Sequence, residues 1–157
     1  MNWYKIAQIN SSDIIIYDFD DTIASGTNNM QRILNIGNDK PYVWLSSFVE
    51  DYKKYGDNLY IMTARMHKTL GDCRKLIKSF LKQFGIDFPE SNIICTGFLP
   101  STWGRKKVEV EKILKNESPR KLIFIDDGIN NREVIDGLQD KYPYTDILVM
   151  GETKNER

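Results

Sequence analysis

Two groups of carboxylates in this chain each follow a strongly apolar stretch. The segment IIIYDFDDTI (14–23) leads from four large apolar residues into DFDD, which contains Asp18 and Asp20. A second acidic pair, Asp126 and Asp127, follows the apolar run KLIFI. Carboxylates that gather at one place repel one another unless a cation offsets their charge. Because Mg²⁺ prefers a few carboxylates together with waters and a phosphate group, the pattern predicts a magnesium site for a phosphorylated substrate.

Short apolar runs alternate along the chain with amphipathic helical patterns, and these elements must position the acidic groups. The runs are apolar at consecutive positions, which is typical of strands buried on both faces of a parallel sheet. We expect strands at 13–19, 58–63, 92–96, 121–126 and 145–150. We expect helices at 41–55, 68–84, 105–116 and 131–142, where apolar residues recur at helical spacing. The alternation predicts an α/β fold, a doubly wound, Rossmann-like parallel sheet of five strands with helices on both faces.

A sheet of this kind binds ligands at the carboxyl ends of its strands. The first and fourth expected strands end in acidic residues, and the second ends in Thr63, Ala64 and Arg65. These side chains are therefore expected to meet at one edge of the sheet.

Composition limits the class of protein. The chain has 157 residues, is 41% hydrophobic and 28% charged, and carries 22 basic and 22 acidic residues. This predicts one globular domain (1–157) with no bulk charge that would steer it to nucleic acid or a membrane. We see no signal peptide, no apolar run long enough to span a membrane, and no sign of an obligate protein partner. Cys73 and Cys95 match neither a disulfide framework nor a zinc pattern, and a cytoplasmic location is expected.

The acidic motifs resemble those of the haloacid dehalogenase-like (HAD) phosphatase superfamily. DFDDT has the form Asp-x-Asp-x-Thr of the first motif of that family. YIMTAR offers Thr63 for the second motif, and WGRKKVEVEKIL offers Lys106 or Lys107 for the third. LIFIDD offers Asp126 and Asp127 for the fourth. All four occur in the family's order and span most of the chain, and helical phase does not choose between the two lysines.

The resemblance implies a role for each motif. Asp18 would attack phosphorus and form an aspartyl-phosphate, and Asp20 would protonate the leaving oxygen and then deprotonate water. Mg²⁺ would be held by Asp18, the backbone carbonyl of Asp20, and Asp126, with Asp127 bound directly or through water. Thr63 and one of the two lysines would bind the phosphoryl oxygens.

The substrate is less narrowly implied. The motif order is similar to that of the phosphatase domain of phage polynucleotide kinase-phosphatases and to that of 5′(3′)-deoxyribonucleotidases. A Mg²⁺-dependent phosphatase of nucleic-acid 3′ ends or nucleotides is therefore expected. Thr22, Thr63, Ala64 and Arg65 are the implied substrate-binding residues, since TAR resembles the Ser/Thr-Gly/Ala-Arg sequence of nucleotide-directed members.

Other assignments stay open. The chain could be a phosphatase of another small phosphometabolite or of a phosphoprotein. It could also be a receiver-like phospho-acceptor signalling domain, or a catalytically idle binding module.

Single residues also have other possible roles. Asp126 and Asp127 could form hydrogen bonds within a turn or cap a helix. Asp21 receives no catalytic role. Stacking of Tyr42, Trp44 or Trp103 on a base is weighed against ordinary packing, and His67 is expected to be a surface or supporting residue.

The interval between the first two motifs leaves residues 24–40 as a small flap and has no room for a large cap domain. The N-terminal stretch NWYKIAQI is expected to be an additional packing segment.

Overall fold

A computed structural model describes residues 9–152 of the chain. The expected packing segment NWYKIAQI therefore lies outside the described residues except for Ile9, which packs against the core.

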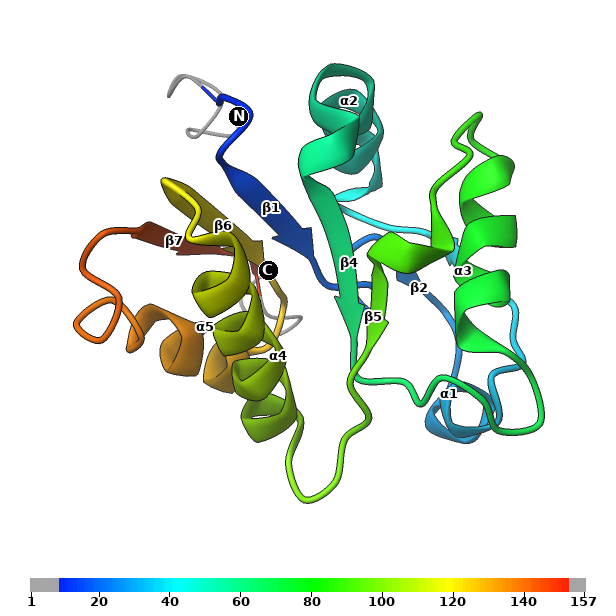
Figure 1. The fold of residues 1–157 in the computed structure, drawn as a ribbon. Coiled ribbons are helices and arrows are strands. Elements are labelled where there is room, and N and C mark those ends of the chain that lie inside the picture. Colours follow the sequence, from blue (N-terminus) through cyan, green and yellow to red (C-terminus); the bar gives the residue numbers. More distant parts are fainter. Residues whose placement is uncertain (1–8, 153–157) are drawn as a thin grey trace.

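The centre of the molecule is a parallel sheet of five strands (Figure 1). Their order across the sheet is β5-β4-β1-β6-β7. The bounds are Ile14–Tyr17 (β1), Leu59–Thr63 (β4), Ile93–Cys95 (β5), Lys121–Ile125 (β6) and Asp146–Met150 (β7). The chain first adds β4 and β5 on one side of β1 and then β6 and β7 on the other side. Strand β1 therefore lies between β4 and β6. The predicted α/β fold class is confirmed.

Four helices cover the two faces of the sheet. They are α2 (Leu45–Tyr55), α3 (Cys73–Lys82), α4 (Thr102–Glu117) and α5 (Ile129–Asp136). Ile15 and Tyr17 of β1 belong to the core under α2 and α3, whereas Ile14 and Ile16 belong to the core under α4 and α5. Successive side chains of a strand point to opposite faces, which explains why this strand is apolar at every position.

The expected helices differ from the observed ones mainly at their ends. The helix predicted over 68–84 begins only at Cys73, because Asp72 accepts a hydrogen bond from Lys75 N (3.2 Å) and caps it there. The one predicted over 131–142 spans Ile129–Asp136 and is followed at Gly137 by a series of turns. Leu138 still packs into the core from those turns, so its apolar spacing did not require a continuous helix.

The predicted flap contains structure that the sequence analysis did not anticipate. Strands β2 (Ala24–Ser25) and β3 (Lys40–Pro41) pair antiparallel and form its base. Between them lies the short helix α1 (Asn29–Leu34), whose first turn is closed by a capping box at Asn28. Single 3₁₀ turns also occur at Gly56–Asn58 and Glu90–Asn92.

The flap is attached to the loop after β4. Asn35, buried and in a left-handed conformation at the end of α1, donates from Nδ2 to the carbonyl of Met66 (2.8 Å) and to Thr69 Oγ1 (3.2 Å). Gly71 N donates to the carbonyl of Leu34 (2.9 Å). A side chain at Gly71 would clash with the backbone carbonyl of Asn35, so this approach requires glycine. The flap thus closes over the end of the sheet toward which β1 and β4 run (Figure 1).

None of the helices described in residues 9–152 combines the length and apolarity needed to cross a membrane.

Candidate active site

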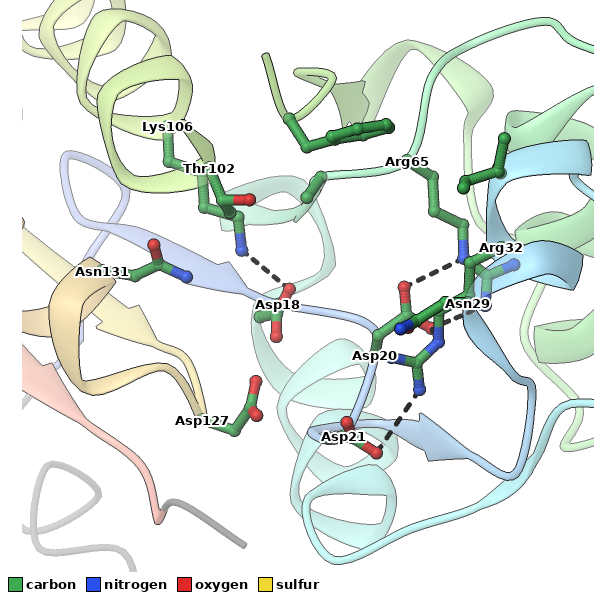
Figure 2. A pocket seen from close by; sticks show the side chains of 13 residues that line it. Asp18, Asp20, Asp21, Asn29, Arg32, Arg65, Thr102, Lys106, Asp127 and Asn131 are labelled. Carbon is green, nitrogen blue, oxygen red and sulfur yellow. Dashed lines mark hydrogen bonds and ion pairs between the residues drawn. The ribbon is translucent and has the colours of Figure 1, made fainter. Parts of the chain in front are cut away.

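Lys106 lies at the centre of a buried charged cluster at the carboxyl edge of the sheet. Its Nζ donates to Asp18 Oδ1 (2.8 Å) and to Asp126 Oδ2 (2.6 Å). The lysine comes from the second turn of α4, and the two carboxylates directly follow β1 and β6. Figure 2 shows Lys106 and Asp18 facing each other across the site. Lys107, the other predicted candidate, is exposed, so the structure brings only Lys106 to the carboxylates.

Asp126 is fixed by several donors. Its Oδ1 accepts from Gly128 N (2.8 Å) and from Asn131 Nδ2 (3.1 Å). Its backbone lies against Gly151, where a Cβ would overlap the Asp126 carbonyl. The turn chemistry considered for this acidic pair is therefore present together with the cluster. Asn131 was not predicted, and its only sequence signal is its position one turn into the helix that follows the acidic pair.

The cluster has the charge pattern of a cation site. Burial, followed by the nearby charge of Asp126, raises the pKa of Asp18 well above its usual value. Burial and Asp126 likewise raise the pKa of Asp127. Burial would lower the pKa of Lys106, but Asp126 and Asp18 outweigh that effect and raise it, so the lysine stays charged. One lysine thus faces three carboxylates, which leaves an excess of negative charge when all are ionised.

The residues present fit a divalent metal ion. Asp18, Asp126 and Asp127 each offer one carboxylate oxygen, and these oxygens all lie within 4.8 Å of one another. Hard oxygen ligands of this kind suit Mg²⁺. The predicted contribution of the Asp20 carbonyl stays a prediction.

The Asp20 carboxylate turns toward the flap. Arg65 grips it with two parallel hydrogen bonds, from Nε to Oδ2 (2.9 Å) and from Nη2 to Oδ1 (2.6 Å). Arg32 of α1 adds a third contact, with Nε 3.2 Å from Oδ1. Figure 2 shows Arg65, from the loop after β4, and Arg32, from α1, meeting at Asp20 on the side away from Lys106. Arg65 was expected to contact phosphate, whereas in the structure its Nε and Nη2 are bound to Asp20.

Two predicted hydroxyl residues lie around Asp18 and β4. Thr22 is buried and donates to Asp18 Oδ2 (3.1 Å), so it orients the carboxylate. Thr63, at the end of β4, is fully buried and accepts from Arg65 N (3.2 Å), which leaves its hydroxyl hydrogen available to donate. Ala64 lines the cavity, whereas Thr63 is not among its lining residues.

A cavity of about 440 Å³ opens over these groups. On one side it is bounded by the flap residues Asn29, Arg32 and Ile33, and on the other by Phe98 and by Thr102 of α4. Phe98 also lines a neighbouring hollow whose walls include His67 and Arg105. The position of the flap helix over the cavity was not predictable from any motif.

The aromatic residues considered for base stacking are placed differently from one another. Trp44 packs against the core and meets the Tyr17 ring edge to face at 6.4 Å. Trp103 is 46% exposed on α4, and Tyr42 is half-buried beside an apolar groove on α2. None of the three lines the cavity over Asp18, where Phe98 is the aromatic residue.

No family model matches this chain, and the search of curated proteins finds no match. Geometry and chemistry alone therefore carry the functional assignment.

Proposed function

We propose that this protein is a Mg²⁺-dependent phosphatase that hydrolyses phosphomonoesters through an aspartyl-phosphate. The observation that carries the proposal is the buried Lys106 ammonium held by Asp18 and Asp126 beneath an open cavity. Buried ion pairs seldom improve stability over apolar packing. This pair lies at the floor of a cavity, at the carboxyl ends of two central strands. A role in binding a ligand or in catalysis explains that position better.

The chain's own groups would supply the nucleophile and the proton transfers of the two displacement steps. An Asp18 carboxylate oxygen attacks phosphorus while the P–O bond to the leaving group breaks, and Asp20 gives its proton to the departing oxygen. Water then attacks the phosphorus, Asp20 takes its proton, and the bond to Asp18 breaks to release inorganic phosphate. Lys106, which lines the cavity, would balance charge on the phosphoryl oxygens.

Asp18, Asp126 and Asp127 would hold the metal ion. A bound Mg²⁺ would supply charge neutralisation and orient the phosphoryl group.

We propose nucleotides or phosphorylated nucleic-acid 3′ ends as substrates. Support comes from the size of the cavity, which suits a small organic ligand, and from the aromatic side chain of Phe98 in its lining. The hollow beyond Phe98, with Arg105 and His67 in its walls, offers room and positive charge for a second nucleotide. Faster release of phosphate from a 3′-phosphorylated oligonucleotide than from a mononucleotide would favour the nucleic-acid end.

The test of the activity is phosphate release from a panel of nucleotides, end-phosphorylated oligonucleotides, sugar phosphates and phosphopeptides. We expect turnover that requires Mg²⁺, is lost with a chelator, and is abolished by Asp18→Asn, which removes the nucleophile while keeping its shape. Asp57→Asn, a change at an exposed carboxylate, is the matched control.

Undiminished turnover by Asp18→Asn would contradict the mechanism. A stable stoichiometric phospho-adduct without turnover would point instead to a phospho-acceptor signalling domain.

We also propose a cytoplasmic location, which is supported by the free thiols of Cys73 and Cys95.

A further inference from the structure

Asp39 is a nearly buried carboxylate that none of the motifs includes. It lies at the base of the flap, immediately before β3, and its side chain is only 4% exposed. Its Oδ1 accepts hydrogen bonds from Thr27 Oγ1 (2.6 Å) and from Arg65 Nη2 (2.9 Å). Asp39 does not line the cavity over Asp18. An effect on a reaction there would pass through Arg65 or, by way of Thr27, through the flap.

Arg65 is held from three directions. Its side chain is 2% exposed, and its guanidinium carbon lies 5.2 Å from the centre of the Phe19 ring. The edge formed by Nε and Nη2 faces Asp20, and the same Nη2 is shared with Asp39. Since that edge is turned to Asp20, Nη1 points away from it, and Nη1 has no hydrogen-bond partner among the described residues. Asp39 is therefore the contact, besides Asp20 itself, that holds the guanidinium group in place.

We propose that Asp39 is a positioning residue for proton transfer by Asp20. It holds Arg65 in the orientation whose two parallel hydrogen bonds fix the Asp20 carboxyl group at the wall of the cavity. This inference rests on the proposed phosphatase function. A purely structural role, in which Asp39 only secures the flap through Thr27, is the alternative that the experiment must separate from it.

The two roles differ in which substrates they affect. When the P–O bond breaks, its electron pair goes to the leaving oxygen. An alkoxide needs the proton of Asp20 at that moment, whereas a nitrophenolate is stable enough to leave without it. Misdirecting Asp20 should therefore slow alkyl phosphates and spare p-nitrophenyl phosphate. A displaced flap would impair binding of both.

The experiment compares kcat and KM for β-glycerol phosphate and p-nitrophenyl phosphate. General acid catalysis contributes roughly 100-fold or more. We expect Asp39→Ala to lower kcat by about that factor on the alkyl ester and by less than about threefold on the aryl ester, with KM little changed. Asp39→Asn keeps an acceptor oxygen and should lose less on the alkyl ester. Asp20→Asn sets the reference pattern, and the exposed Asp57→Asn is the control.

Equal losses on both esters, a change confined to KM, or no loss would overturn the positioning role. If Asp39→Ala does not fold, Asp39→Asn decides, because an amide can keep both hydrogen-bond partners only in part and still leaves the flap attached through Asn35. Failure of the wild-type protein to release phosphate from these two esters and from every substrate of the panel would overturn the proposed function itself, and this inference with it. The two failures are thus distinguishable.

Discussion

Lys106 joins two carboxylates that are far apart in the sequence and come from neighbouring strands. Its ammonium lies within hydrogen-bonding distance of Asp18 and Asp126, and its side chain is 2% exposed. Removing such a group from water costs several kcal/mol, which its ion-pair partners must offset. The lysine is therefore poorly explained by stability, and its position beside the proposed nucleophile gives it an electrostatic task.

Changing Lys106 to methionine should abolish most of the phosphatase activity. Methionine keeps the length and the apolar stem but removes the charge that would balance the phosphoryl oxygens. Removal of one such electrostatic group typically costs on the order of 100-fold in kcat. The measurement is kcat for the best substrate of the panel at saturating Mg²⁺.

Lys107→Met is the matched control, since Lys107 is exposed one position along the same helix. An exposed change of this kind should alter activity by no more than about twofold. Equal losses in the two variants would show that the lysine pair acts through general surface charge, and the assignment of Lys106 would then be wrong.

At the scale of elements, the sheet was predictable and the flap was not. Each strand is a short run that is apolar at consecutive positions, because both of its faces are covered. The choice between Lys106 and Lys107 needed the structure. Lys106, Val110 and Leu114 are the buried positions of α4. Val110 and Leu114 follow Lys106 by four and eight residues and Lys107 by three and seven, so both lysines fit the same helical stripe.

Helix α1 gave only a short signal. Met30, Ile33 and Leu34 recur at helical spacing after the capping box of Asn28, but a helix of six residues that buries none of them is too short for periodicity to identify. Its place over the cavity depends on Asn35, whose partners Met66 and Thr69 lie more than 30 positions away. Contacts of this kind join two loops and leave no periodic pattern in the sequence. The same reason hides Asp39 and Arg32 from sequence analysis.

Asn35→Ala should loosen the flap without unfolding the sheet. The change removes the hydrogen bonds from Nδ2 and replaces a residue that tolerates its left-handed conformation (φ 52°). Losing buried hydrogen bonds costs about 1–2 kcal/mol, which corresponds to roughly 5- to 30-fold faster opening. Hydrogen exchange of the amides in 29–36 measures this, and KM should rise because Arg32 and Asn29 line the cavity.

Asn38→Ala is the control within the same flap, since Asn38 is exposed. It should leave both the exchange rates and KM close to those of the wild type. If Asn35→Ala exchanges no faster than the Asn38 variant, the contacts with the loop after β4 do not hold the flap in place.

The molecule as a whole carries no net charge, yet it concentrates negative charge at one edge of its sheet. Asp18, Asp126 and Asp127 converge there because they follow the ends of the neighbouring strands β1 and β6, and Lys106 offsets only part of their charge. Folding without a cation must work against this repulsion. A bound divalent ion would therefore stabilise the entire fold and not merely the site.

Mg²⁺ should accordingly raise the melting temperature, and more so at higher pH. The pKa values of Asp18 and Asp127 are raised in the folded, metal-free protein. Their protons therefore stabilise the fold at low pH, and that contribution is lost as the pH rises through the raised pKa values. Metal and proton compete for the same oxygens, so the Mg²⁺ effect should be larger at pH 7.5 than at pH 5. At about 100 times its Kd, the ion contributes ~2.7 kcal/mol to the free energy of unfolding, or roughly 5–10 °C in melting temperature for a domain of this size.

Thermal melts with Mg²⁺ or a chelator at both pH values measure the effect. Asp126→Asn should abolish the response, while Asp57→Asn should keep it. A Mg²⁺ shift that is equal at the two pH values, or that survives Asp126→Asn, would place the ion elsewhere on the protein.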